Sequence, residues 1–225
     1  MSFGQPRLHY RVVDSTNQRA RELAARGAPH GTVITAREQS AGRGRQGRTW
    51  TGPPGSALLC SVVVRDPPRL LPLAAGVAVA EVAGPEAQLK WPNDVLIGGR
   101  KVAGILVEGR LQEGWAVVGV GINVAVSLDQ LPAELHDRAG TLGLQAQDVE
   151  PTLERLMDSL ERWCAAGSDR VLEAVRSRDA LRGHRVRWAE GEGDAAGIDG
   201  EGRLIVVTAD GHVALEAGEV HLVAT

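Results

Sequence analysis

The segment from residue 37 to residue 55 is rich in glycine, arginine and proline, so neither a helix nor a strand can run far through it. Connections inside compact domains are usually much shorter than this, and long loops are commonly functional. The fold must therefore be built from elements on either side of the segment. We expect the segment itself to form part of a binding site.

Patterns on both sides of this loop predict strands interleaved with helices. Ser15 and Gln18 have the spacing of a capping box and Gly27 is placed as a C-terminal stop, which predicts a helix over residues 14–27. The pair Gly98-Gly99 predicts the tight turn of a hairpin. Apolar patterns predict further strands over 32–36, 56–64, 88–91, 95–97, 101–108 and 115–124, and further helices over 70–83, 151–166 and 168–180.

From about Leu181 the pattern changes to short strands with glycine-rich turns, including Asp210-Gly211 between two apolar runs. This change predicts a small all-β module over residues 181–225 after a larger domain over residues 1–180. Residues 191–202 read as a loose stretch of Gly, Asp and Glu.

Composition excludes several classes of protein. With 43% hydrophobic and 24% charged residues, the chain is typical of a globular protein. A formal net charge of -3 offers no overall attraction to nucleic acid, so we expect none as a partner. We expect neither a signal peptide nor a membrane span, because no basic region leads into an apolar run at the start and no later apolar run reaches the length of a span. Cys60 and Cys164 are isolated, which favours the reducing cytoplasm.

The densest motif is the run from Gly42 to Trp50, GRGRQGRTW. It satisfies the dinucleotide-binding pattern GxGxxG and nearly satisfies a phosphate-binding P-loop, but both motifs must open a helix. The residues that follow, TGPPG, cannot continue one, so a P-loop nucleotide hydrolase is excluded. Glycines between Arg43, Arg45 and Arg48 would instead let the backbone wrap a small ligand while guanidinium groups grip carboxylate or phosphate. A solvated basic loop is the alternative.

Two further motifs contain polar side chains that could bind a ligand, although ordinary structural roles also explain them. Lys90 precedes a Trp-Pro-Asn-Asp turn at the end of a predicted strand, where it can point into a pocket or simply lie at the surface. In Asp14-Ser15-Thr16-Asn17-Gln18, capping explains Ser15 and Gln18. Thr16 and Asn17 remain free to bond a ligand at the helix start.

The predicted strands over 101–108 and 115–124 are mostly core, because small and branched residues alternate along them. Lys101, Gly104 and Asn123 are the functional candidates, although Asn123 also suits an ordinary strand end. The histidines show no metal-ligand spacing, and GxSxG and HExxH motifs are absent. We therefore expect no protein-held metal site and neither a serine hydrolase nor a zinc enzyme.

Taken together and in this order, the four motifs resemble those of the biotin protein ligase family, over roughly residues 10–125. The resemblance implies an α+β fold, with a class II aminoacyl-tRNA synthetase-like mixed sheet that carries helices on one face, followed by a small SH3-like β barrel. It also implies the site. Biotin would bind at Ser15, Thr16, Asn17, Gln39, Gly42, Arg43, Gly44, Arg45, Lys90 and Gly104, ATP would bind at Arg48, Trp50, Lys101 and Asn123, and Lys90, Arg45 and Arg48 would be catalytic.

The activity so implied joins biotin to AMP at the expense of ATP and then transfers biotin to a lysine of a biotin carboxyl carrier protein. We expect Mg²⁺ to enter bound to the phosphates of ATP. A lipoate or octanoate ligase or transferase on the same core and a non-catalytic biotin sensor are the alternatives, and the oligomeric state is left open between monomer and homodimer.

The chain departs from the family pattern in two places. Only 13 residues precede Asp14, so we expect neither the DNA-binding helix-turn-helix domain of many members nor a repressor role. Residues 125–149 contain no Trp, Tyr or Phe to stack on adenine. An aliphatic cover from Leu142 or Leu144 is the replacement that we predict.

Overall fold

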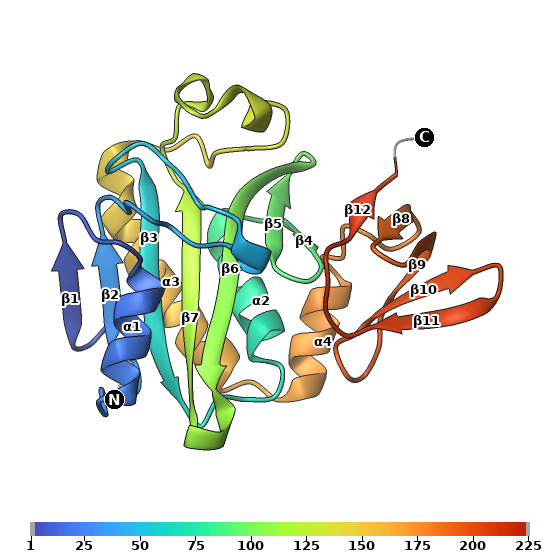
Figure 1. The fold of residues 1–225 in the computed structure, drawn as a ribbon, viewed down its shortest axis with the longest axis horizontal. Helices are drawn as coiled ribbons and strands as arrows, with labels where there is room; N and C mark the ends of the chain where they lie inside the picture. Colours follow the sequence, from blue (N-terminus) through green and yellow to red (C-terminus); the bar gives the residue numbers. More distant parts are fainter. Residues whose placement is uncertain (1–2, 224–225) are drawn as a thin grey trace.

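In the computed structural model, which describes residues 3–223, the larger sheet has seven strands in the order β1-β2-β3-β7-β6-β5-β4 (Figure 1). The edge pair β1 and β2 is parallel and every other neighbouring pair is antiparallel, so the sheet is mixed as predicted. The strands are β1 (Arg7–Tyr10), β2 (Val33–Ala36), β3 (Ala57–Arg65), β4 (Gln88–Lys90), β5 (Asp94–Ile97), β6 (Arg100–Arg110) and β7 (Trp115–Asn123). Of these, β1 was not predicted from the sequence.

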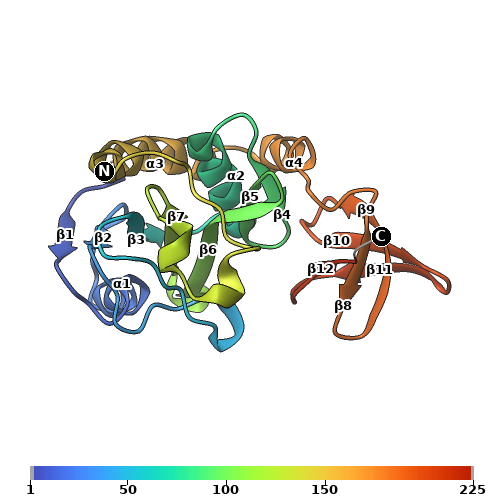
Figure 2. The ribbon, with the colours of Figure 1, turned by 90° about the horizontal axis from the view of Figure 1, so that it is seen from above.

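Helices cover both faces of this sheet, so the prediction of helices on one face is wrong (Figure 2). Helices α2 (Leu71–Ala83) and α3 (Val149–Cys164) pack on one face, and α4 (Ser168–Arg176) packs beside α2. On the other face lies α1 (Thr16–Ala25), where Ala20 and Ala24 pack against Val63 of β3. The helical periodicity of α1 identifies its buried side but cannot say which face of the sheet that side meets.

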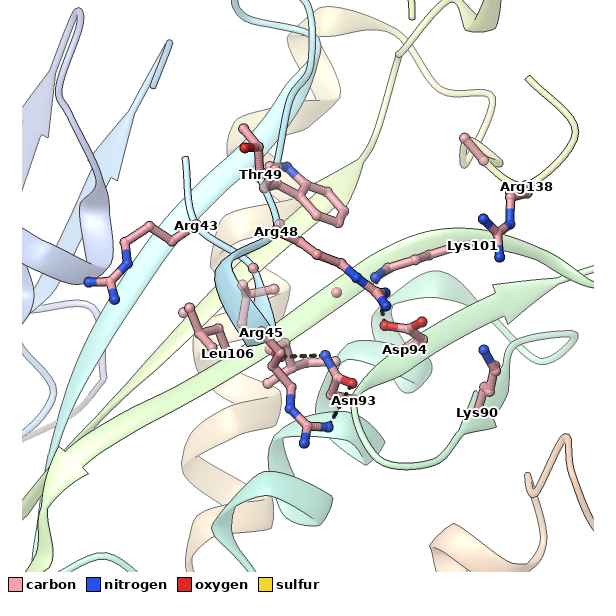
Figure 3. A pocket seen from close by; sticks show the side chains of 18 of the residues that line it. Arg43, Arg45, Arg48, Thr49, Lys90, Asn93, Asp94, Lys101, Leu106 and Arg138 are labelled. Carbon is pink, nitrogen blue, oxygen red and sulfur yellow. Dashed lines mark hydrogen bonds and ion pairs between the residues drawn. The ribbon is translucent and has the colours of Figure 1, made fainter. Parts of the chain in front are cut away.

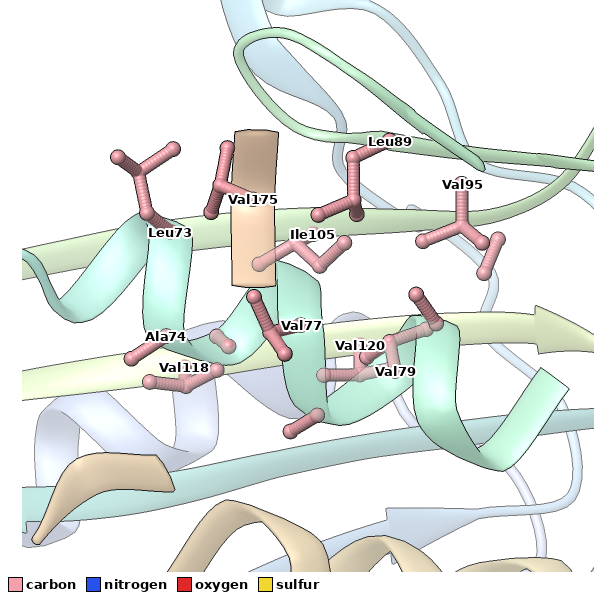
Figure 4. Close-up of a cluster of buried hydrophobic side chains, with 14 of the residues drawn as sticks. Leu73, Ala74, Val77, Val79, Leu89, Val95, Ile105, Val118, Val120 and Val175 are labelled. Atoms are coloured by element: carbon pink, nitrogen blue, oxygen red, sulfur yellow. The ribbon is translucent and has the colours of Figure 1, made fainter. Parts of the chain in front are cut away.

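Helix α2 is buried on nearly all sides because it lies between the sheet, α3 and α4 (Figure 4). Its Val77 and Val79 lie over Val120 of β7, while Leu73 lies near Val175 of α4. A helix that is apolar all round must be buried, and this one forms the centre of the core.

The helix start at Ser15 follows only half of the predicted capping box. Ser15 Oγ accepts a hydrogen bond from the Gln18 amide at 3.5 Å, but the Ser15 amide donates to Asp14 Oδ1 at 2.7 Å. The Gln18 side chain donates to Glu22 instead, so the reciprocal half is wrong: the neighbouring carboxylate takes its place. The glycine turns were predicted correctly, since Gly27 follows the helix at φ 89° and Gly98 and Gly99 turn the β5–β6 hairpin at φ 56° and 75°.

In the part of the chain from residue 181 to 223, five short strands form an antiparallel sheet in the order β11-β10-β9-β8-β12. They are β8 (Arg185–Trp188), β9 (Gly191–Ile198), β10 (Leu204–Thr208), β11 (Gly211–Leu215) and β12 (His221–Leu222). Strand β9 corrects the prediction of a loose stretch over residues 191–202. Its inward positions include Gly193 and Ala195, which are small enough to hide the alternation of a strand.

The two sheets share one core rather than meeting at a flexible linker. Trp91, after β4, is buried and its Nε1 donates to the Gly202 carbonyl at 3.1 Å. The Leu89 amide donates to Arg178 O at 2.7 Å, and Val186, Leu204 and other residues of the second sheet belong to the same buried cluster as α2. The second sheet is thereby held beside the end of β4. No helix among residues 3–223 has the length and apolar character needed to cross a membrane.

Candidate active site

A cavity of about 650 Å³ opens where the start of α1, the Gly/Arg loop, the β4–β5 turn and the ends of β6 and β7 meet (Figure 3). Residues from the loop over 131–139, together with β12 and the residues just before it (218–222), complete its wall. Each candidate site residue predicted from the sequence lines this cavity except Gly42. The structure therefore brings the four separate motifs together in one place.

At the α1 end, buried polar side chains bond to one another. Thr16 donates to Gln39 Oε1 from its amide at 2.8 Å and from its hydroxyl at 3.1 Å. The hydroxyl of Ser61 on β3 donates to Asn17 Oδ1 at 2.6 Å and lies 2.8 Å from Thr16 Oγ1. The sequence predicted that Thr16 and Asn17 would remain free to bond a ligand, and this prediction is wrong. Both side chains are already held by protein partners.

Asn17 anchors α1 to the sheet through its remaining donor. Its Nδ2 donates to Glu108 Oε2 at 2.9 Å and to Leu106 O at 3.3 Å. Gly119 on β7 is required here, because a Cβ at that position would overlap the Asn17 amide group. The result is a rigid, uncharged pocket wall whose shape is fixed before any ligand arrives.

The Gly/Arg loop doubles back on itself instead of opening a helix. The Gly44 amide donates to Arg48 O at 2.7 Å and the Trp50 amide to Gly42 O at 3.1 Å, around a single short 3₁₀ turn, Arg45–Gly47. A Cβ at Gly42 would overlap the Trp50 carbonyl, so this glycine permits the close approach of the two arms of the loop. Gly42 thus shapes the loop and does not line the cavity.

The three arginines of the loop point in different directions (Figure 3). Arg43 points toward α1 and pairs with Glu108 of β6 at 3.2 Å. Arg45 Nη1 donates to Asn93 Oδ1 at 3.2 Å, and Arg48 forms an ion pair with Glu219, which lies just before β12. Only Arg45 and Arg48 therefore turn toward the Lys90 side of the cavity.

Two lysines and one carboxylate occupy the β4–β6 wall. Lys101 Nζ pairs with Asp94 Oδ1 at 2.6 Å, whereas Lys90 has no ion pair or hydrogen bond from its ammonium group within residues 3–223. Burial lowers the pKa of Lys90, the nearby cations Lys101, Arg138 and Arg48 lower it further, and Asp94 partly offsets them. A half-buried, unpaired ammonium among other cations is a strong site for an anion.

Trp50 lies flat on the floor of the cavity over two glycines. A Cβ at Gly104 would lie 2.9 Å from the ring, and one at Gly121 would overlap it. Lys101 Nζ lies 5.6 Å from the ring centroid, within cation–π range. The buried Trp50 Nε1 has no hydrogen-bond partner among the described residues. These glycines therefore serve to seat an aromatic ring in the site.

Asn123, at the end of β7, is buried and its Nδ2 donates to Gly140 O at 2.8 Å. This bond holds the following loop over the cavity. The predicted covers are wrong: Leu142 packs against the main core, and Leu144 is 38% exposed and lines no part of the cavity. Leu131 and Leu135 line it instead, because short 3₁₀ turns fold the loop back over Trp50.

Several residues of the site were missed from the sequence. Ser61 could have been noticed as a lone polar residue inside an apolar strand, and Asn93 and Asp94 lie within a motif that drew attention only to its lysine. Glu219 and Arg138 gave no local signal, since isolated charged residues are ordinary on surfaces. No group of three or more His, Cys, Asp or Glu side chains in the described residues is arranged to hold a metal ion.

Comparisons with known proteins agree with this geometry. Residues 9–125 match the biotin/lipoate A/B protein ligase family, and residues 189–223 match the biotin protein ligase C-terminal domain. A biotin–[acetyl-CoA-carboxylase] ligase of Mycobacterium tuberculosis is 37% identical, over 93% of this chain and 87% of its own length. The bifunctional ligase/repressor BirA of Bacillus subtilis is 33% identical over 98% of this chain and 75% of its own length. The solved biotin protein ligase from Aquifex aeolicus in complex with biotin and ATP has a TM-score of 0.80 at 28% identity, covering 98% of this chain and 100% of that one.

Proposed function

This chain belongs to the biotin/lipoate A/B protein ligase family, and on that premise we infer that it is an ATP-dependent biotin protein ligase. It forms biotinyl-5′-AMP from biotin and ATP and then transfers biotin to a lysine of a biotin carboxyl carrier protein. The observation that carries this function is a single cavity in which an uncharged polar pocket adjoins a cluster of cations. Biotin offers an uncharged cyclic urea at one end and a carboxylate at the other, and ATP offers a polyphosphate.

In the first step a carboxylate oxygen of biotin attacks the α-phosphorus of ATP. A new carbon–oxygen–phosphorus anhydride forms, the bond from the α-phosphorus to the bridging oxygen breaks, and pyrophosphate leaves with the electron pair. The protein needs no nucleophile for this step. It accelerates the reaction by aligning the two substrates and by placing fixed positive charge where negative charge grows.

In the second step the carrier lysine amine attacks the carbonyl carbon of the anhydride. The bond to AMP breaks, AMP leaves, and the amine loses its proton to give the amide. The anhydride reacts readily with water, so the Gly/Arg loop over the cavity also has to exclude water until the carrier arrives. Its contact from Arg45 to Asn93 at 3.2 Å supports this covering role.

We assign the biotin head group to the wall made by Ser15, Thr16, Asn17 and Gln39. This wall is rigid and uncharged, which suits the urea. Arg43, Gly44 and Gly104 would border the rest of the molecule, with Gly42 shaping the loop. At the junction with ATP, Lys90, Arg45 and Arg48 would carry the catalytic charge.

We assign the nucleotide to Trp50, Lys101, Asn123 and Arg48. With Nδ2 of Asn123 bonded to Gly140 O, its oxygen is left to accept from the adenine amino group. Leu131 and Leu135 would cover the base in place of an aromatic ring. We expect ATP to enter with Mg²⁺ on its phosphates, since Mg²⁺ relies on substrate oxygens with one or two carboxylates, and Asp94, Asp137 and Glu219 line the cavity.

We further propose that residues 1–180 form the catalytic domain, with a class II aminoacyl-tRNA synthetase-like sheet, and that residues 181–225 form an SH3-like barrel. The seven-stranded mixed sheet and the five-stranded antiparallel sheet of residues 3–223 support this division. The reducing cytoplasm is the compartment that suits two free cysteines.

The function can be tested directly by incubating the chain with ATP, Mg²⁺, biotin and a biotin carboxyl carrier domain and measuring the intact mass of the carrier. We expect the carrier to gain one biotinyl group, and to gain none when its acceptor lysine is replaced by arginine. A carrier left unmodified by biotin but modified by lipoate in a parallel reaction would replace the proposal with the lipoate alternative. Tight biotin binding without consumption of ATP would replace it with the sensor.

A further inference from the structure

Arg138 is a cation of the cavity wall that the motifs did not predict. It lies in the loop between β7 and α3, and its side chain is exposed within the cavity. Figure 3 shows its guanidinium directed into the open space beside Lys101 and facing Lys90. The position is therefore open to a ligand from the cavity side.

The backbone of Arg138 is fixed even though its side chain is exposed. Its carbonyl accepts from the Lys101 amide at 2.8 Å, and its amide donates to Leu135 O at 3.0 Å. The Gly140 amide donates to Lys101 O at 2.8 Å, so this end of the loop is bonded to β6 on both sides of Lys101. The guanidinium is thus projected from a rigid base next to a predicted ATP-binding lysine.

Within residues 3–223 the guanidinium of Arg138 has no hydrogen-bond or ion-pair partner, which distinguishes it from most cations of the site. Arg48 pairs with Glu219, Lys101 with Asp94, and Arg45 with Asn93. Arg138 and Lys90, by contrast, make no ion pair or side-chain hydrogen bond with any of residues 3–223. Two unpaired cations facing one space favour a ligand that carries more than one negative charge.

The electrostatics of neighbouring groups place Arg138 in the same space. The pKa of His221 on β12 is lowered by burial first and then by Lys90, Arg138 and Arg48. The pKa of Lys90 is lowered by burial and by Lys101, Arg138 and Arg48. Each of these groups therefore feels the positive charge of Arg138, and an arriving anion would relieve their mutual repulsion.

The position of Arg138 and Lys90 along the cavity indicates which anion they bind. Arg43 and the uncharged wall of Thr16 and Asn17 lie toward α1, whereas Arg138 and Lys90 lie on the opposite side (Figure 3). We propose that Arg138 contacts the β and γ phosphates of ATP and, after the first step, the pyrophosphate that they form. This inference rests on the proposed function, which puts biotin at the α1 end and ATP beyond it.

The test replaces Arg138 with Gln and measures the formation of biotinyl-AMP in the absence of carrier. Loss of one charge-assisted contact should raise the KM for ATP and the inhibition constant of inorganic pyrophosphate each by about tenfold. The KM for biotin should stay within about twofold, because the α1 end is untouched. Arg138→Lys should recover part of both losses, since it restores the charge without the planar fork.

Arg110→Gln is the matched control. Arg110 also lies on the exposed surface and its replacement removes the same charge, but it pairs with Glu113 at the far end of β6 and does not line the cavity. It should leave all three constants unchanged. An Arg138→Gln enzyme with wild-type constants for ATP and pyrophosphate overturns the inference while leaving the ligase function intact.

A wild-type chain that makes no biotinyl-AMP refutes the proposed function instead. Calorimetric titration with inorganic pyrophosphate then still tests the anion site by itself. Weaker pyrophosphate binding by Arg138→Gln than by Arg110→Gln supports the site, and equal binding overturns it.

Discussion

The two ends of the cavity are built on opposite principles. At the α1 end, Thr16, Asn17, Ser61 and Gln39 are bonded to one another, and each polar contact is short and internal. At the other end the side chains are charged, and Lys90 and Arg138 have no partner in the described residues.

Under the proposed function, this difference follows from what each end binds. An uncharged ligand gains little from flexible charges and much from a fixed shape, so its pocket can be completed in advance. A polyphosphate supplies so much negative charge that the protein can leave cations unpaired until it arrives. The free-energy cost of burying those cations and of their mutual repulsion is offset when the ligand binds.

Replacing Lys90 with Ala should have the largest effect, because it removes, at the proposed reaction centre, a half-buried charge that has no ion-pair partner within residues 3–223. We expect the rate of biotinyl-AMP formation to fall by about a hundredfold to a thousandfold. Biotin affinity should fall far less, since the head-group wall is elsewhere. Single-turnover kinetics and calorimetry measure the two quantities, and full activity in this variant would remove Lys90 from the mechanism.

Replacing Ser61 with Ala should disturb the hydrogen bonds of the uncharged wall at the α1 end of the cavity. Ser61 is fully buried on β3, does not line the cavity, and holds Thr16 and Asn17 in place. Leaving those groups unsatisfied should cost about 1–3 kcal/mol of unfolding free energy. It should also weaken biotin binding by roughly tenfold with little change in the KM for ATP.

Ser159→Ala is the control for this loss, because Ser159 is equally buried but bonds Glu81 far from the cavity. It should lower the stability measured by urea unfolding without changing biotin affinity. If both variants weaken biotin binding alike, Ser61 has no positioning role.

A smaller effect is expected from pH. Lysine is charged below its pKa, and the pKa of Lys90 is lowered by burial and neighbouring cations. The rate of biotinyl-AMP formation should therefore fall as pH rises through a value below the ordinary lysine pKa of about 10.4. In Lys90→Arg the fall should move to higher pH, because arginine keeps its proton. The same alkaline limb in both proteins would assign that titration to another group.

How much of the fold could be predicted from the sequence depends on whether each element is determined by neighbouring residues. Some elements depend only on neighbouring residues, and for these the structure agrees with the prediction. They are the loop over 37–55, the strand over 56–64, the apolar helix over 70–83 and the Gly98-Gly99 turn. Strand β9 was missed because its inward side chains are too small to mark a period. The side of the sheet that α1 covers depends on the path of the chain, which no local pattern contains.

The candidate site divides in the same way. The Gly/Arg loop and Lys90 were found because they belong to compact motifs, and the cavity gathers them. Arg138 and Glu219 come from distant segments and enter the site only through tertiary packing. The bonded state of Thr16 and Asn17 could not be foreseen, because their partner Ser61 lies on another strand.

The division of the cavity into an uncharged end and a cationic end is tested most directly by the salt dependence of the KM values for the two substrates. The KM values for ATP and for biotin in biotinyl-AMP formation would be compared in the wild-type chain at about 50 mM and about 300 mM salt, a range over which screening of exposed charges changes strongly. We expect the KM for ATP to rise severalfold and the KM for biotin to change much less. An equal rise in both constants would contradict the division.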